Sequence, residues 1–226
     1  MITIRVRQIL GGGILVMSLA LVARGRDSSE ADLRTLESPE ARAAAQVVCA
    51  YYRARDQFDF DQARSLEAAD GVMINEKGER HTRSAERLRE FMDYEKVMHG
   101  SWACRALGYA NGQLEAEITE DNDYYTLLGI GKSVEIERFR VAGGQIHEIA
   151  SVKRRYTGRD QSPAYQEFVK WVSQQPTEKQ NGVLRNGDLF FDGEGARKQL
   201  PLLLEFQALK AGSAPTHWAG RPIERC

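Results

Sequence analysis

The sequence lacks a strong charge of either sign and the motifs of several common enzyme classes. Its 226 residues include 31 Lys and Arg and 32 Asp and Glu, for a net charge of −1 at pH 7. This balance argues against a basic surface for nucleic acid. The chain also has no Gly-rich phosphate loop and no Gly-x-Ser-x-Gly nucleophile elbow. We therefore expect no nucleic-acid partner and no bound cofactor.

Histidine and cysteine are scarce. The four histidines have no metal-ligand spacing, so we expect no metal site. The cysteines are Cys49, Cys104 and Cys226. A Cys49–Cys104 bridge requires the helix that holds Cys49 to pack on the strand that holds Cys104. The interpretation that we favour is two buried free thiols, with Cys226 unpaired.

Long apolar runs are absent except at the N-terminus. Arg5 and Arg7 precede a segment that carries no charge from Gln8 to Ala23. This pattern favours a cleaved export signal over residues 1–23, and a retained membrane anchor is the alternative. No lipobox cysteine follows, and residues 24–38 are polar and predict a spacer. We therefore expect a periplasmic or secreted protein, or one anchored by this segment; only an uncleaved segment would give it a membrane contact.

Three helices are predicted in the first part of the chain. Ser38-Pro39 is typical of a helix start, and apolar residues then recur at helical spacing as far as Tyr52. A short second helix would begin at Asp59 or Asp61 and end at Gly71. A third, with Ser84 near its cap, covers "TRSAERLREFMDYEKVMH".

Strands dominate the middle of the chain. "VMINEKGER" has the pattern of a strand that enters a turn. Four further strands follow, with turns at Asn111-Gly112, at 121–123 and at Gly143-Gly144. We expect the fourth of the five to be long, over 124–141, with a bend at Gly129 and Gly131. This order predicts an α+β fold in which a strongly bent antiparallel sheet wraps three helices.

The chain changes character after Tyr156. A helix is predicted from Ser162-Pro163, a hairpin over 181–195, and a last helix over 196–210 despite Pro201. We interpret residues 157–226 as an α-rich extension that packs on the preceding domain.

The order of elements over about 40–155 resembles the nuclear transport factor 2-like superfamily. The segments that carry this resemblance are "VCAYYRARDQFDFDQARSLEAADGVMINEKG" and "VEIERFRVAGGQIHEIASV". The resemblance implies one domain over 39–156, shaped as a cone with an apolar pocket at its open end. Members of this superfamily include isomerases, dehydratases, epoxide hydrolases and cyclases, as well as binding proteins without activity, so the fold does not decide function.

One member of that superfamily, ketosteroid isomerase, suggests which residues to examine. Its enolate-binding tyrosine corresponds to Tyr51 and its protonated acid to Glu137, but its base falls on Asn75, whose amide cannot accept a proton at neutral pH. His147 and Trp102 are further candidates for the pocket. We keep Asp93 or His147 as an alternative base.

Glu137 is unusual because alternation along a strand places it on the same face as Phe139 and Val141. Burial would raise its pKa and let it donate a hydrogen bond to Tyr51 or to a ligand oxygen. The alternative is that Glu137 pairs with Arg105, or that the register differs and it is solvated.

Three functions follow as hypotheses. The first is an exported protein that binds a small apolar ligand or a protein partner without catalysis. The second is an acid–base enzyme acting on a small apolar carbonyl or hydroxyl compound. The third is an envelope assembly component. The resemblance also implies a homodimer formed through the sheet.

Overall fold

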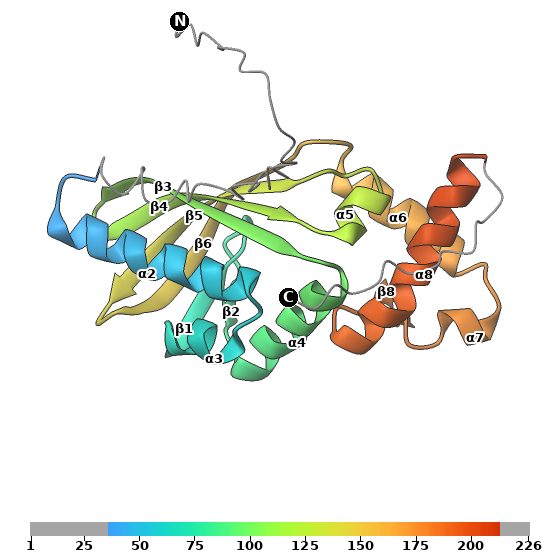
Figure 1. Ribbon diagram of the computed structural model, residues 1–226, viewed down its shortest axis with the longest axis horizontal. Coiled ribbons are helices and arrows are strands. Elements are labelled where there is room, and N and C mark those ends of the chain that lie inside the picture. Colours follow the sequence, from blue (N-terminus) through green and yellow to red (C-terminus); the bar gives the residue numbers. More distant parts are fainter. Residues whose placement is uncertain (1–35, 213–226) are drawn as a thin grey trace, which may run out of the picture.

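The computed structural model describes residues 36–212 (Figure 1). The expected export signal over 1–23, most of the spacer, and Cys226 lie outside these residues. Within the described part, no helix is both long and apolar enough to span a membrane. The elements, in order, are α2 (Pro39–Asp56), α3 (Phe60–Ser65), β1 (Glu67–Ile74), β2 (Arg80–Thr82), α4 (Ala85–Val97), β3 (Ser101–Ala110), β4 (Gln113–Asp121), α5 (Asp123–Leu127), β5 (Ser133–Ala142), β6 (Gln145–Tyr156), α6 (Gln161–Val172), α7 (Thr177–Gln180), β7 (Leu184–Arg185), β8 (Asp188–Leu189) and α8 (Gly193–Lys210).

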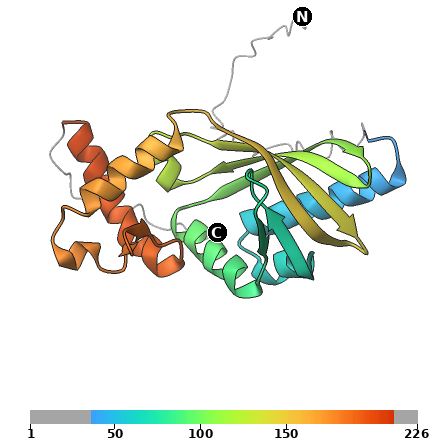
Figure 2. The same ribbon diagram turned by 180° about the vertical axis from the view of Figure 1, so that it is seen from behind.

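The larger sheet has six strands in the order β2-β1-β6-β5-β4-β3. Helix α2 lies across one face, and β5 and β6 are seen from behind in Figure 2. The α+β prediction is confirmed, but the prediction of a purely antiparallel sheet is wrong because β1 pairs with β6 in parallel. A strand's own pattern does not determine its neighbour, since this pairing joins segments about 80 residues apart in sequence.

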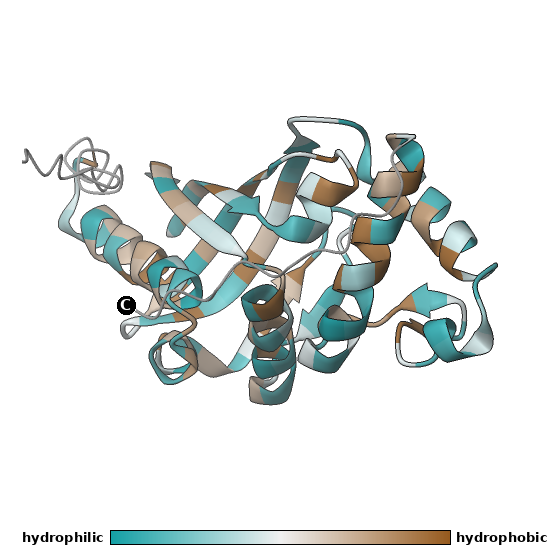
Figure 3. Ribbon diagram, turned by 45° about the vertical axis from the view of Figure 1, so that its right-hand side comes forward, coloured by the Kyte–Doolittle hydropathy of each residue, from teal (hydrophilic) through white to brown (hydrophobic). Residues whose placement is uncertain are grey.

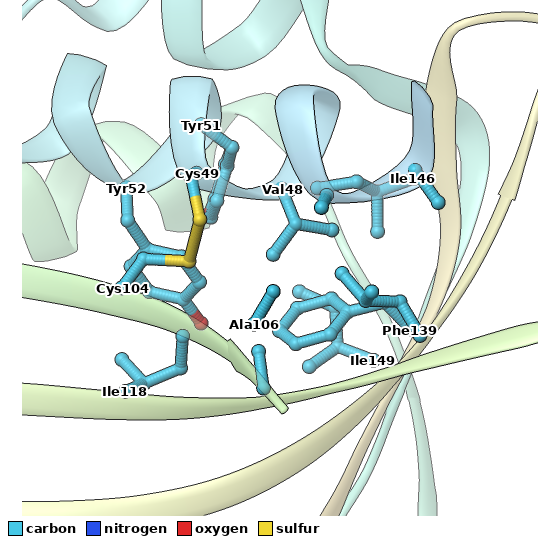
Figure 4. Packing of buried hydrophobic residues seen from close by; sticks show 14 of the residues in the cluster. Val48, Cys49, Tyr51, Tyr52, Cys104, Ala106, Ile118, Phe139, Ile146 and Ile149 are labelled. Atoms are coloured by element: carbon cyan, nitrogen blue, oxygen red, sulfur yellow. A yellow bond between two sulfur atoms is a disulfide. The ribbon is translucent and has the colours of Figure 1, made fainter. Parts of the chain in front are cut away.

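Helix α2 forms where the sequence predicts it. Ser38 caps it by accepting from the amide of Ala41, and Pro39 occupies the first turn, where a missing N–H has no consequence. Its buried face lies over the sheet, against Phe139 and Ile149 (Figure 4).

A disulfide joins α2 to β3. It links Cys49 and Cys104, whose Cα atoms are 5.4 Å apart (Figure 4). The interpretation of these residues as free thiols is therefore wrong. Helix α2 packs directly on β3, which is the arrangement that the bridge requires.

Two predicted boundaries are wrong. Helix α3 ends at Ser65 rather than at Gly71, and β1 begins at Glu67. Pairing with β6 overrides the helix propensity of this alanine-containing segment. The expected long strand over 124–141 instead begins with α5, capped by Asn122, and β5 starts only at Ser133.

The C-terminal helices share a second apolar core with α4 and α5. Tyr94 and Met98 of the α4 region are buried in this core, together with Phe168 of α6 and Leu203 of α8. Figure 3 shows hydrophobic bands on the helices at this end of the molecule. The predicted hairpin is present as β7–β8, and α8 continues through Pro201.

Candidate functional site

Glu137 lies inside the protein, in contact with helix α2. Strand β5 alternates so that Glu137 and Phe139 are buried while Arg138 and Arg140 are exposed. The Tyr52 hydroxyl donates to Oε2 of Glu137 at 2.5 Å. Burial, helped by the nearby charge of Glu135, raises the pKa of Glu137 to about 7.

The tyrosine that contacts Glu137 is therefore Tyr52 and not Tyr51. The Tyr51 hydroxyl instead accepts from the Arg83 guanidinium at 2.5 Å, and Arg83 also pairs with Glu67, which is 2% exposed. Burial raises the pKa of Tyr51. The alternative partner Arg105 is also wrong, since it pairs with Glu117 at 3.0 Å on the outward face of the sheet.

Arg55 follows Tyr51 and Tyr52 by one helical turn and points to the same region. It is 8% exposed, and its Nε and Nη2 atoms have no hydrogen-bond partner among the described residues. Its guanidinium lies 3.8 Å from the ring centroid of Trp102 and 5.0 Å from that of Phe91. The indole N–H of Trp102 is likewise buried and, in the described part of the chain, has no partner.

Two further carboxyl groups lie close to Arg55. The Asn122 side-chain amide donates to Glu120 at 3.0 Å and to Glu95 at 3.5 Å. Burial and the charge of Glu95 raise the pKa of Glu120 well above its ordinary value, and burial raises the pKa of Glu95 against the opposing effect of Arg55. Two carboxyl groups this close do not both ionise readily.

These residues form one electrostatically connected group, which we call the polar cluster. When Arg64, which lies 3.7 Å from Glu67, is counted, five carboxyl groups face four guanidinium groups, an excess of one acid. Burial is the main cause that raises the pKa of Glu95, Glu120 and Glu137, and neighbouring carboxyl groups add to it for Glu120 and Glu137. The charged members are Arg55, Arg64, Glu67, Arg83, Glu95, Glu120, Glu135, Glu137 and Arg154.

Asn75 and His147 were expected in the pocket with Glu137, but the described structure places their side chains against other residues. Asn75 lies in the turn between β1 and β2, where its carbonyl oxygen accepts from the amides of Lys77 and Glu79. His147 is partly exposed and faces Asp70 at 3.8 Å. Trp102 is the one further candidate that the structure places in contact with Tyr52, at 5.5 Å between ring centroids.

Most residues of the polar cluster were not predicted from the sequence. Arg55 had a usable signal, because it follows Tyr51 and Tyr52 at i+4 and i+3 on the apolar face of a helix. Glu67 had none, since the segment around it was interpreted as helix.

Two hollows among the described residues lie away from the polar cluster. One of about 510 Å³ lies between α4 and α8 and is lined by Asp93, Lys96 and Arg197, among others. Another of about 290 Å³ lies beside Gly182 and Phe190. Asp93 is exposed and lines the first of these hollows, and the described residues show no contact between it and Glu137.

Comparisons with known proteins concern the fold. No protein-family model and no curated protein matches the chain in sequence. Similar solved structures include an NTF2-like protein of unknown function from Cytophaga hutchinsonii, with 11% identity, 53% of this chain and 92% of that chain covered, and a TM-score of 0.38. An LEH-like epoxide hydrolase from M. tuberculosis has 20% identity over 51% of this chain and 81% of that chain, with a TM-score of 0.39. A cystatin-fold protein from Novosphingobium aromaticivorans has 10% identity over 48% and 96%, with a TM-score of 0.38.

The superfamily that the sequence resembles is thus also named among the similar solved structures. The identities are under 25% and the TM-scores under 0.5, and similarity at this level does not indicate a shared activity. The strands and helices described above establish the α+β arrangement. The polar cluster holds the buried groups that a function could use.

Proposed function

We propose that this chain is an exported, cone-shaped nuclear transport factor 2-like protein that binds a small, mostly apolar molecule without changing it chemically. The observation that carries the proposal is the buried Tyr52–Glu137 pair beside the aromatic ring of Trp102. A polar pair within an otherwise apolar interior gives a ligand both an apolar surface and fixed hydrogen-bonding groups.

Binding is favoured over catalysis because the chain lacks a suitable residue at the position that the resemblance assigns to the base. Asn75 stands there, and its side chain holds a turn. Proton abstraction needs a group within hydrogen-bond reach of the substrate and with an appropriate pKa.

One observation favours the enzyme as the second candidate. Glu137 has a pKa of about 7, which suits a general acid or base near neutral pH. Glu137 could act in that way only if Tyr52 released it to the substrate.

Native mass spectrometry of protein purified from an expression host tests the first proposal. We expect an added mass that disappears on denaturation and is reduced in Tyr52→Leu, which removes both the hydroxyl that holds Glu137 and the ring beside Trp102, whereas Glu115→Gln on the outward face leaves it unchanged. Recovery of the released molecule unaltered after incubation with fresh protein supports binding. A new product that Glu137→Gln abolishes would establish the enzyme. Absence of any adduct would favour a protein partner.

Export is supported by the Cys49–Cys104 disulfide, because such bonds persist mainly in oxidising compartments. The mass of the mature protein tests this part of the proposal. Loss of about the first 23 residues would establish a cleaved signal, and the full mass in a membrane fraction would establish an anchor.

The homodimer through the sheet remains a prediction. The outward side chains include the exposed Leu107 and Val152. They also include ion pairs such as Arg138–Glu115, which would lose hydration in an interface. Light scattering of the purified protein distinguishes a dimer from a monomer.

A further inference from the structure

We infer that Arg55 and Trp102 form a subsite that binds the carbonyl oxygen of an uncharged, planar apolar ligand. This inference rests on the proposed function and identifies the part of the ligand that the interior recognises.

Arg55 and Trp102 carry buried hydrogen-bond donors that no described residue accepts. The Tyr52 hydroxyl already donates to Glu137, so it has no proton left for a ligand. In contrast, the described residues provide no acceptor for Nε and Nη2 of Arg55 or for Nε1 of Trp102. Buried donors without partners are rare in folded proteins, and each one needs an explanation such as a missing ligand. An oxygen atom with two lone pairs can accept from both side chains at once.

The side chains of Arg55 and Trp102 lie directly against each other. The Arg55 guanidinium lies 3.8 Å from the centroid of the Trp102 ring, so the unpaired donors of the two side chains share one small region. The rings of Phe91 and Tyr52 lie 5.0 and 5.6 Å from the same guanidinium. The rings form an aromatic side of this region, which suits a planar molecule, and the carboxyl groups of Glu95 and Glu120 also lie near the guanidinium.

The charged groups around Arg55 favour a ligand without charge. Glu95 and Glu120 lie near Arg55, and the polar cluster already has more carboxyl than guanidinium groups. A ligand carboxylate would add to that excess of acid, whereas a neutral ketone or aldehyde oxygen would not. The structure therefore favours an uncharged acceptor.

The entry route follows from exposure. Trp102 and Phe91 are half-buried and in contact, with ring centroids 6.5 Å apart, and Trp102 is stacked on the guanidinium. Rotation of the Trp102 side chain would remove the ring that covers this guanidinium.

The test uses a fluorescent naphthyl ketone, 6-propionyl-2-(dimethylamino)naphthalene, and its counterpart in which a propyl group replaces the propionyl group. Both are titrated into the full chain. We expect the ketone to bind about tenfold or more tightly than the propyl compound, as is usual for a hydrogen bond from a charged donor. Trp102→Phe keeps an aromatic ring and removes the N–H, and Arg55→Met keeps the length and removes the charge. Each variant should abolish most of that tenfold preference.

Two controls separate the possible failures. Arg55→Met removes unsatisfied buried donors but also a cation beside Glu95 and Glu120, so circular dichroism and a melting curve check that it folds. Trp102→Phe changes no charge and tests the subsite by itself if Arg55→Met does not fold. Glu115→Gln on the outward face should bind both compounds as the wild type does. Equal binding of the two probes, or a preference that survives both Trp102→Phe and Arg55→Met, would overturn the subsite. If a native-mass adduct then persists, the proposed function stands without it. Absence of both the adduct and probe binding would overturn the two proposals together.

Discussion

Replacing Glu137 with glutamine is expected to flatten the dependence of stability on pH between pH 5 and pH 8. In the unfolded chain this carboxyl releases its proton near its ordinary pKa of 4.5, whereas burial raises the pKa in the folded protein to about 7. Between these values the folded state binds more protons than the unfolded state. Raising the pH therefore favours unfolding, and the stability present below pH 4.5 is lost as the pH rises through 7.

The magnitude follows from the two pKa values. A difference of one in pKa corresponds to 1.36 kcal/mol, so the full rise is equivalent to about 3 kcal/mol. About 2 to 3 kcal/mol of this falls between pH 5 and pH 8. Glutamine has a similar shape, carries no titrating proton and can still hydrogen-bond to Tyr52. The variant should consequently gain stability relative to the wild type as the pH rises.

Urea unfolding at several pH values measures this change, because urea is uncharged and leaves the electrostatic interactions unscreened. The relevant quantity is the difference in free energy of unfolding between variant and wild type at pH 5 and at pH 8. Glu115→Gln, on the outward face of the neighbouring strand, is the matched control and should leave the slope unchanged. If Glu137→Gln has the wild-type slope, Glu137 does not hold a proton in the folded protein at neutral pH.

The remaining predictions concern the charged and covalent links within the domain. Arg83→Met should lower the free energy of unfolding by about 3 kcal/mol, because it leaves the buried Glu67 without its closest cation. Arg87→Met, in an exposed ion pair, is the control and should change it by less than about 0.5 kcal/mol. Equal values for the two variants in urea unfolding would contradict this. Replacing Cys49 and Cys104 together with alanine should cost about 4 kcal/mol, since the bridge closes a loop with a sequence separation of 55 residues. Unchanged stability of that variant, or equal melting temperatures of the wild type with and without reductant, would mean that the bridge does not constrain the unfolded chain.

Strand alternation predicted that Glu137 points inward, but it did not predict that Tyr52 would be its hydrogen-bond partner. Alternation depends on each residue's own strand and requires no knowledge of the rest of the protein. The choice between Tyr51 and Tyr52 depends on how α2 is rotated about its axis over the sheet. Both tyrosines are buried, so their hydrophobicity alone does not distinguish them.

The burial of Arg55 and Glu67 shows the same limit. Charged residues are usually exposed, and their neighbours in sequence do not reveal whether a partner lies across the fold. Glu67 is buried because Arg83 reaches it from the segment before α4. Only the packed structure brings these two side chains together.

Features that depend on a few adjacent residues could be predicted from the sequence. Ser38 and Ser84 cap helices where predicted, and Asn111-Gly112 forms a turn with φ values of 55° and 75°, a conformation that those two residues tolerate well. Tertiary structure alone decided the parallel pairing of β1 with β6, the Cys49–Cys104 bridge and the polar cluster. Each of these joins segments far apart in the chain, so its free energy depends on burial and contacts that no local pattern encodes.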